Sequence, residues 1–294
     1  MKRVIGVLLS LFFLAVSASA NVRSGISGNV NWGASQISAE VSLDLGSAGI
    51  SAPGSRVRAE RLVSSEFFRL MRPHILSLQV DSSTTVADLV LRGLLSLSDV
   101  EEIVLSATRV PPSLSPNLMN MLAFHTISLD TISAALLRHT LPLEPMRTLQ
   151  GVAAPNFTGI IIIATDSLPM HGMIGSAQPV PSLFPRIWDT DMNLIFERNM
   201  LNIGVPAMVR YAPSESIFRD TPSGLSPELA ELVGDWPLRI IARGVFGTSP
   251  TDIIIDQGDA LQIISTDNNR RLLAQGRVAI ILPDSALTSG FSGN

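Results

Sequence analysis

The chain contains no cysteine, and its only lysine is Lys2. The first absence excludes disulfide bridges, thiolate nucleophiles, cysteine-ligated zinc, iron–sulfur clusters and a cysteine that could carry a bacterial lipid anchor. The second excludes a P-loop lysine, Schiff-base chemistry and a lysine general base in the rest of the chain. Every cationic side chain after Arg3 is therefore arginine or a titrating histidine.

Aromatic residues and positive charge are also scarce. Aromatic residues make up 5% of the chain, and the formal net charge is −4. A mildly acidic chain binds nucleic acid and anionic lipid poorly, so we expect neither as a main partner. After the signal sequence the longest apolar run, residues 160–164, has only the length of a strand, so we expect no later transmembrane segment. Nothing in the sequence points to a cofactor.

The first 20 residues have the pattern of a secretory signal peptide. Lys2 and Arg3 supply positive charge, residues 4–16 are apolar, and residues 18–20 form an A-x-A cleavage site. We therefore predict cleavage before Asn21 and a periplasmic or secreted protein. The remaining chain is rich enough in aliphatic residues to build sizeable cores without disulfides.

Composition and pattern divide the chain into two α+β domains, each expected to be a mixed β-sheet packed with helices. A segment rich in Ser, Gly and Asn precedes the first domain, and a basic, proline-bearing connector separates the two. The predicted division is signal peptide 1–20, flexible leader 21–33, first domain 34–137, linker 138–155, second domain 156–284 and frayed tail 285–294.

Periodicity predicts the elements of the first domain. Apolar side chains alternate at 37–45 and 119–129, which is the pattern of half-buried strands. A helix with one apolar stripe follows Ser55, its expected N-cap, and Pro73 is expected to bend or end that helix. Ser98, with glutamate three residues later, resembles the capping box of a further helix.

In the second domain, the aliphatic run at 160–164 predicts a strand buried on both faces. Residues 168–185, rich in Pro, Gly and Ser, are expected to form a long loop, and residues 187–196 a hairpin. Further elements are expected as strands at 207–211, 238–245, 253–255 and 277–282, and as one helix from Asp256 to a C-terminal Gly276.

Several positions of the first domain share the pattern of a known family: Ala59, Phe67, Val80, residues 81–85, Leu89 and Ala107. With the strand that closes this half, residues 35–129 resemble the LPP-twenty-like lipoprotein family, which includes the flagellar basal-disk protein FlgP. The second half resembles a companion segment of spirochaete and related bacterial envelope proteins, at residues 159–164, 184–189, 237–244, 252–260 and 276–278.

The resemblance implies an envelope-associated, non-catalytic assembly role, with envelope or flagellar proteins as partners. It carries over no catalytic residue. Members of the family are commonly lipidated, whereas this chain has no acceptor cysteine. A soluble periplasmic or secreted state is therefore favoured over an outer-membrane anchor.

Two groups of acidic residues have the chemistry of a hard-cation site. Asp252, Asp256 and Asp259 surround one turn, whereas Asp189 and Asp191, followed by an asparagine, reproduce the D-x-D-x-N start of a calcium loop. That loop is incomplete, because leucine stands where glycine is needed and methionine replaces the closing glutamate. Helix capping explains the first group and a hairpin turn the second, so we interpret both as structural.

The four histidines include no pair with helical metal-ligand spacing. His125 lies on an apolar strand face and is expected in the core. His171 lies in the predicted loop and is the one candidate for a ligand or a general base. The chain lacks a G-x-S-x-G nucleophile elbow, which weakens a hydrolase hypothesis.

Two sets of residues are candidates for an interface. The arginines of the first helix form a solvated face by default, but they could bind an acidic partner or a neighbouring subunit. The scarce aromatic residues fill cores more often than they anchor interfaces. The candidates are Arg56, Arg61, Arg69, Trp188, Tyr211 and Trp236.

The sequence favours a non-enzymatic, exported envelope protein with a structural or assembly role, possible self-association, and no metal or cofactor. One alternative is a periplasmic ligand- or peptide-binding module that uses residues 168–185 as a lid. A less favoured alternative is a hydrolase that uses His171.

Overall fold

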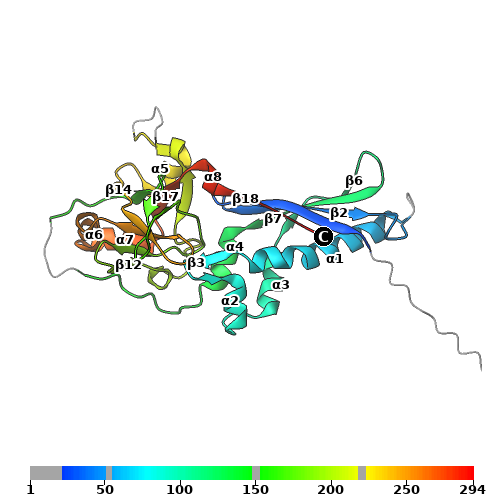
Figure 1. Ribbon diagram of the computed structural model, residues 1–294, viewed down its shortest axis with the longest axis horizontal. Helices are drawn as coiled ribbons and strands as arrows, with labels where there is room; N and C mark the ends of the chain where they lie inside the picture. Colours follow the sequence, from blue (N-terminus) through cyan, green and yellow to red (C-terminus); the bar gives the residue numbers. More distant parts are fainter. Residues whose placement is uncertain (1–21, 51–54, 148–152, 218–222) are drawn as a thin grey trace, which may run out of the picture.

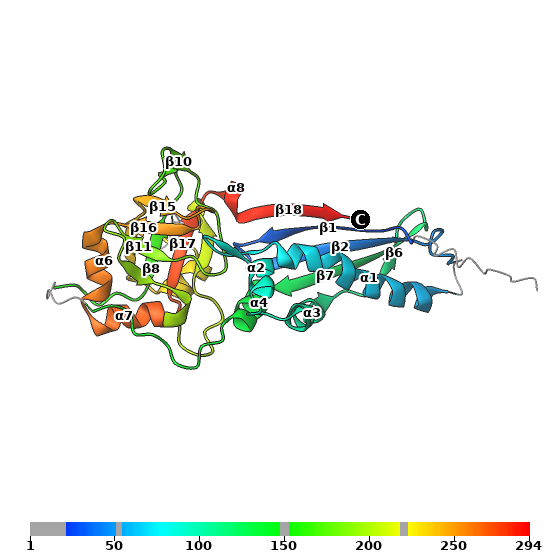
Figure 2. The ribbon, with the colours of Figure 1, turned by 60° about the horizontal axis from the view of Figure 1, so that its bottom comes forward.

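The computed structural model describes residues 22–50, 55–147, 153–217 and 223–294, so the predicted signal peptide lies outside the described residues. The two α+β domains lie end to end and give the molecule an elongated shape (Figure 1). In the first domain, helices cover one face of a long sheet (Figure 2). The second domain packs its helices around two smaller sheets.

The first domain is built on a six-stranded sheet in which every pairing is antiparallel. Its strands, in spatial order, are β18 (Thr288–Gly293), β1 (Ser24–Asn31), β2 (Gln36–Asp44) and β7 (Asn120–Ser128), with β5 (Thr108–Arg109) and β6 (Ser113–Leu114) both paired to β7. The predicted alternation is confirmed along β2 and β7, since every second residue is buried. Met119 differs from the prediction, because it precedes β7 and is exposed.

The prediction of a flexible leader is wrong for residues 24–31, which form β1. Ile26 and Val30 point inward, and the glycine between them occupies the same face. A Cβ at Gly28 would lie 2.3 Å from the carbonyl oxygen of Ser38 and 2.6 Å from the ring of Phe291. The glycine therefore serves close packing of neighbouring strands, not chain flexibility.

The prediction of a frayed tail at 285–294 is also wrong. Residues 288–293 form β18, which returns to the first domain and places Phe291 opposite Gly28. The strand follows α8 (Asp284–Leu287), whose last carbonyl accepts a hydrogen bond of 2.9 Å from the backbone N–H of Trp32. Small residues give this segment no apolar alternation, so only the long-range pairing makes it a strand.

In the described part of the first domain, four helices and a short hairpin complete the fold. They are α1 (Arg56–Leu76), α2 (Val86–Leu91), α3 (Leu97–Leu105) and α4 (Leu129–Leu136), with β3 (Gln79–Asp81) paired to β4 (Thr84–Thr85). Pro73 lies in the last turn of α1, which ends three residues later. The capping box of α3 uses Ser96 and Asp99, two residues earlier than predicted.

The second domain contains two four-stranded sheets. The first is wholly parallel, in the order β13 (Arg210–Pro213), β17 (Val278–Leu282), β8 (Ile160–Ile163) and β14 (Leu238–Ile241). The second is mixed, in the order β12 (Leu194–Phe196), β11 (Ile187–Asp189), β16 (Asp252–Ile255) and β15 (Gly244–Phe246).

Shorter elements surround these two sheets. They are β9 (Leu168–Pro169), β10 (Ser176–Ala177), η1 (Arg198–Met200), η2 (Ser214–Ile217), α5 (Pro227–Val233), α6 (Gln257–Ile264) and α7 (Asp267–Ala274). β8 is buried along most of its length, as predicted for the aliphatic run. The predicted hairpin at 187–196 is confirmed by the antiparallel pairing of β11 with β12.

Other predictions for the second domain are corrected by the structure. The strand expected at 238–245 is two strands in different sheets, because the backbone N–H of Ala242 binds Ile163 whereas that of Arg243 binds Ile254. The single helix expected after Asp256 is two helices, because the side chain of Thr266 caps a new start. The loop expected at 168–185 contains the hairpin of β9 and β10.

One hydrophobic cluster joins the two domains. It includes Trp32, Leu129 and Ile132 from the first domain and Phe184 and Tyr211 from the second. Within the described ranges, no helix is both long and apolar enough to cross a membrane.

Candidate functional site

A buried carboxylate, Asp252, lies where the two domains meet. It begins β16, is 0% exposed, and accepts a hydrogen bond of 2.9 Å from the hydroxyl of Ser82 in the first domain. The backbone N–H of Arg186 and the indole N–H of Trp188 also donate to it, each at 3.1 Å. Burial raises the pKa of Asp252, although the hydrogen bonds from Arg186, Trp188 and Ser82 oppose that rise.

The backbone around Ser82 strengthens this joint. The carbonyl of Ser82 accepts a hydrogen bond from the backbone N–H of Ser249 at 2.9 Å, and the carbonyl of Val80 accepts one from the backbone N–H of Phe184 at 2.7 Å. Gly247 has φ +108°, and a Cβ there would lie 2.2 Å from that of Ser82. The guanidinium of Arg186 lies 3.6 Å from Asp81 and 3.8 Å from Asp252, so it bridges carboxylates of both domains.

A second set of polar contacts between the domains, centred on the Arg210–Asp130 ion pair, lies at the start of α4. Arg210 of β13 forms a bidentate ion pair with Asp130, at 2.5 and 2.7 Å, and donates to the hydroxyl of Ser35 at 2.8 Å. Beside it, the ring of Trp32 meets that of Tyr211 edge-on, with centroids 5.8 Å apart. The two domains are therefore fastened by polar groups at two places as well as by apolar packing.

Tyr211 belongs wholly to this internal joint. Its hydroxyl donates to the carbonyl of Ser182 at 2.9 Å and accepts from the N–H of the same residue at 3.0 Å. Burial raises the pKa of the phenol. Tyr211 and Trp188, both predicted as interface candidates, thus contact the joint between the chain's own domains.

The acidic candidates for a cation site each have a local structural partner. Asp189 closes the hairpin by accepting from the backbone N–H groups of Asp191 and Asn193, at 3.0 and 2.8 Å. Asp191 accepts from the side-chain amide of Gln257. Among the described residues, no three His, Asp or Glu side chains are placed so that they could hold a metal ion.

The other two acidic candidates lie at the start of α6. Asp256 caps the helix by accepting from the N–H of Gly258 at 2.9 Å, as predicted. Asp259 lies in the first turn, and burial together with the neighbouring Asp256 raises the pKa of its carboxyl. Asp252 faces the joint instead of this turn, so the structure does not bring the three carboxylates together around a cation.

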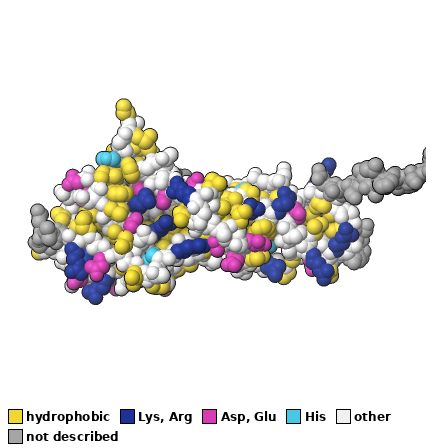
Figure 3. All heavy atoms as spheres, turned by 90° about the horizontal axis from the view of Figure 1, so that it is seen from below, with side chains coloured by type: hydrophobic (Ala, Val, Ile, Leu, Met, Phe, Trp, Pro, Cys, Tyr) yellow, Lys and Arg dark blue, Asp and Glu magenta, His cyan; other side chains and the backbone are white. Residues whose placement is uncertain are grey.

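The remaining candidates lie apart from the joint. Arg56 pairs with Glu60 at 2.8 Å on the exposed face of α1, and Arg61 is exposed on the same helix. Trp236 is 66% exposed, and His171 is exposed with its ring 6.0 Å from that of Phe246. On the face seen in Figure 3, arginine and acidic side chains are interspersed, which is typical of a solvated surface.

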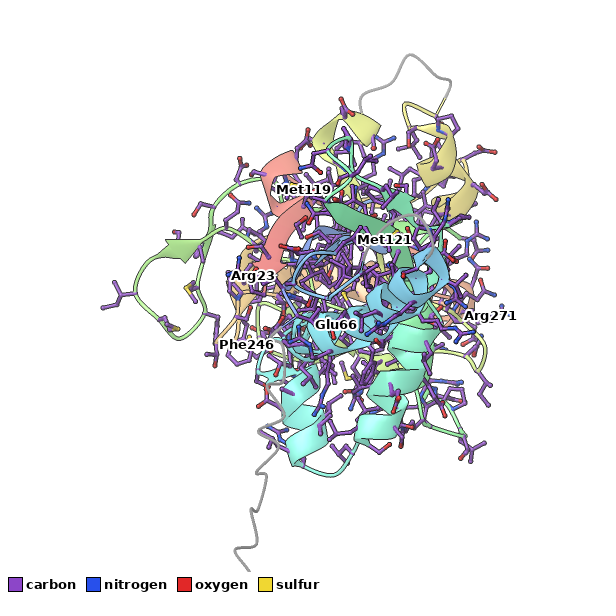
Figure 4. The ribbon with its side chains drawn as sticks, turned by 90° about the vertical axis from the view of Figure 1, so that its right-hand side faces the viewer. Arg23, Glu66, Met119, Met121, Phe246 and Arg271 are labelled. Atoms are coloured by element: carbon purple, nitrogen blue, oxygen red, sulfur yellow. The ribbon has the colours of Figure 1, made fainter. Side chains whose placement is uncertain are left out.

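Arg69 of α1 lines a groove. It donates to Glu66 at 2.7 Å and to the hydroxyl of Ser24 at 2.9 Å. Burial acts to raise the pKa of Glu66, but the hydrogen bonds from Ser24 and Arg69 outweigh it, so this pKa is lowered. Arg23 and Glu66 lie together at the end of the molecule that faces the viewer in Figure 4, where the groove measures about 830 Å³.

The outer edge and outer face of the six-stranded sheet are open. Among the residues that the structure describes, β18 pairs with β1 on one side only and ends the sheet. It carries no charge and no proline, and most of its residues are exposed. Cross-strand rows such as Gly290–Asn29–Ser38 lie on the face opposite the helices. Sequence patterns missed this surface, because its Ser, Gly and Asn residues are equally typical of loops.

Sequence reasoning also missed the partners of the joint. Ser82 and Arg186 appeared only within longer segments of the family resemblance, and Asp130 and Arg210 carried no motif. Their roles depend on contacts between residues far apart in the chain. The charged residue that opens the isoleucine run 253–255 was the one available signal, because a carboxylate beside such a run needs a buried partner.

Comparison with known families matches both domains. Residues 23–135 match the family model of the N-terminal domain of Treponema pallidum Tp0624, and residues 159–285 match that of its second domain. No curated protein matches the chain. The pair of matches defines a spirochaete-type two-domain protein. The chain belongs to the family that these two Tp0624 domains describe.

Proposed function

We propose that the protein is a non-enzymatic, exported component of the cell envelope with a structural or assembly role. It works as a rigid two-domain unit that pairs with a second copy of itself through the edge of β18. Its partners are further copies and other envelope or flagellar proteins. The resemblance of residues 35–129 to the LPP-twenty-like family supports an envelope location.

The observation that carries this proposal is the free edge of β18. An edge strand presents unpaired N–H and C=O groups, and soluble proteins usually guard such an edge with lysine, proline, a bulge or a covering loop. β18 has neither lysine nor proline, and its register with β1 is regular across six pairs. Two such edges meeting antiparallel would form one continuous sheet across a two-fold axis.

The joint between the domains supports the same role. Asp252, Ser82 and Trp188 satisfy one another's hydrogen bonds, and Arg210 and Asp130 form a second clasp. These buried and partly buried polar groups hold the domains in one relative position. A rigid connection suits a protein that transmits position or load within an assembly.

The proposal is tested by measuring the mass of the protein in solution over a range of concentrations. We expect reversible association that Gly290→Lys weakens by about tenfold, since an edge lysine opposes strand addition. Lysine is tolerated there, because the nearest atom to a Cβ at Gly290 is 3.8 Å away. Ser38→Lys is the matched control: it adds the same charge to the same cross-strand row, but on an interior strand.

The two variants separate the possible outcomes. If Ser38→Lys alone weakens association, the copies meet through the sheet face and not through its edge. A protein that stays monomeric at high concentration, and that cross-links to no envelope protein from a photoreactive group placed at position 290, contradicts the proposal.

A second candidate function is a ligand- or peptide-binding module. The groove of about 830 Å³ that contains Arg23, Glu66 and Arg69 favours it, because its charged groups could hold a polar ligand. A thermal-shift screen with short peptides and glycans, repeated on Arg69→Ala, tests this function. A ligand that raises the melting temperature of the unmodified protein but not that of Arg69→Ala would support the binding function.

A further inference from the structure

We infer that the hairpin of β9 and β10 inserts its tip into the interfacial region of a neutral lipid bilayer. At this tip, Ile174 is 107% exposed and Met173 is 60% exposed. The hairpin projects from the body of the second domain, as Figures 2 and 4 show. This role is separate from strand pairing at β18 and does not depend on it.

The chemistry of the hairpin fits a lipid surface. No Asp, Glu, Lys or Arg occurs from residue 167 to residue 185, and the one histidine there, His171, lies at the base of the tip beside Phe246. Insertion of Met173 and Ile174 therefore transfers no carboxylate, ammonium or guanidinium group out of water. The two exposed side chains are apolar and lie between Gly172 and Gly175. The outermost atoms of the projection at the top of Figure 3 are hydrophobic.

Hydrogen bonds within the backbone of the tip also favour insertion into a bilayer. The N–H of Met170 donates to the carbonyl of Gly175 at 3.1 Å, and the N–H of Met173 donates to the carbonyl of Met170 at 3.2 Å. Gly172 and Gly175 have φ of +76° and +115°, values that let the turn close in this way. Amide groups already paired inside the turn lower the cost of moving it out of water.

The base of the hairpin is fixed to the domain. The N–H of His171 donates to the carbonyl of Val245 at 2.9 Å, and Met170 forms a bridge with the same residue. Leu168 and Ala177 pack against the main core. The tip is therefore presented in one position, and little ordering is needed when it enters the membrane.

A lipid surface explains the tip better than a protein partner does. A stable protein interface buries roughly 800 Å² on each partner, which two side chains on a narrow turn cannot supply. Insertion into a bilayer requires only the transfer of those side chains. Because the tip is uncharged and the chain is acidic, binding should not depend on anionic lipid or fall when salt is raised.

Vesicle flotation of the chain from residue 21 onward tests the inference. We expect the protein to float with phosphatidylcholine vesicles equally well in 0.1 and in 0.5 M salt. Between these concentrations the electrostatic screening length falls from about 10 to about 4 Å, so attraction between charges would weaken. The double variant Met173→Ser/Ile174→Ser should bind at least about tenfold more weakly. Its melting temperature should stay unchanged, because both side chains are exposed.

The matched control removes a comparable pair of exposed side chains from the first domain. Leu91→Ser/Leu105→Ser changes residues that are 84% and 70% exposed on α2 and α3, and it should bind as the unmodified protein does. In a second measurement, a tryptophan introduced as Ile174→Trp should add fluorescence that brominated phosphatidylcholine quenches.

Any one of three results would overturn the inference: that the unmodified protein does not float, that the tip variant floats as well as the control variant, or that the added fluorescence at position 174 is not quenched. If the tip variant instead lowers self-association without vesicles, the tip contacts a second copy of the chain. Because Gly290→Lys leaves the tip intact, failure here and failure of strand pairing at β18 are distinguishable.

Discussion

Phe291 of β18 stacks on His74 of α1, with ring centroids 4.2 Å apart and planes inclined by 27°. The same ring fills the space that Gly28 leaves open in β1. The last strand is therefore held to the first domain by side-chain packing as well as by its ladder with β1. This contact helps to keep β18, and not β1, at the edge of the sheet.

Removal of the Phe291 ring should release β18. We expect Phe291→Ala to lower the free energy of unfolding by about 1–2 kcal/mol, since the side chain is only partly buried, and to speed amide exchange at residues 288–293. Hydrogen exchange read by mass spectrometry checks this. Phe124→Ala is the control, because Phe124 is exposed on the outer face of β7. Equal exchange in the two variants would show that the ring does not hold the strand.

Loss of the carboxylate at the joint should uncouple the domains. Asp252→Ala leaves the hydroxyl of Ser82 and the indole N–H of Trp188 without their acceptor, and we expect a loss of about 3–5 kcal/mol. Urea unfolding followed by circular dichroism should change from one transition to two. Asp256→Ala, which removes a helix cap and an exposed ion pair with Arg243, should cost about 1 kcal/mol and keep one transition. A single transition in Asp252→Ala would contradict the role of the joint.

The interaction energy of the Arg210–Asp130 ion pair can be measured by a double-mutant cycle. Arg210→Ala, Asp130→Ala and the double variant should give a coupling energy of about 1–2 kcal/mol, because the pair is bidentate and partly buried. Chemical denaturation supplies the three values. Arg56→Ala with Glu60→Ala, an exposed pair on α1, is the control and should couple by no more than about 0.5 kcal/mol. Equal coupling in both cycles would mean that Arg210 contributes as an ordinary surface charge.

Sequence patterns predicted the elements whose structure depends on residues close together in the chain. The alternation along β2 and β7, the aliphatic strand β8 and the hairpin closed by Asp189 all follow from neighbours in sequence. β1 and β18 were missed because their small residues have the composition of loops. β1 is a strand because it pairs with β2 along its whole length, and β18 is a strand because it pairs with β1, where Phe291 meets Gly28.

The same distinction applies to the candidate site. The cap formed by Asp256 could be predicted, because its partner is two residues away. The role of Asp252 could not: the isoleucine run beside it signals that the carboxylate needs a buried partner, but not that this partner is Ser82 of the other domain. Trp188 and Tyr211 were predicted as interface candidates, but the sequence does not show that the surface they meet belongs to the same chain.

The stability of the first domain should decrease as the pH falls below about 6.5. His125 is buried against Phe67, with ring centroids 3.7 Å apart, and burial lowers its pKa, with Arg109 acting in the same direction. The unfolded chain therefore binds a proton at a higher pH than the folded chain does, and the free energy of unfolding falls by up to about 1.4 kcal/mol per pH unit in that window. Burial also lowers the pKa of His74, which adds a term of the same sign.

His125→Phe isolates this contribution, because phenylalanine can keep the stacking on Phe67 but cannot titrate. Urea unfolding between pH 7 and pH 5 should give a flatter dependence for the variant than for the unmodified protein. Asp252, whose pKa is raised by burial, contributes with the opposite sign, but it is the same in both proteins and cancels from the difference. Parallel curves would show that His125 is protonated as readily in the folded chain as in the unfolded one.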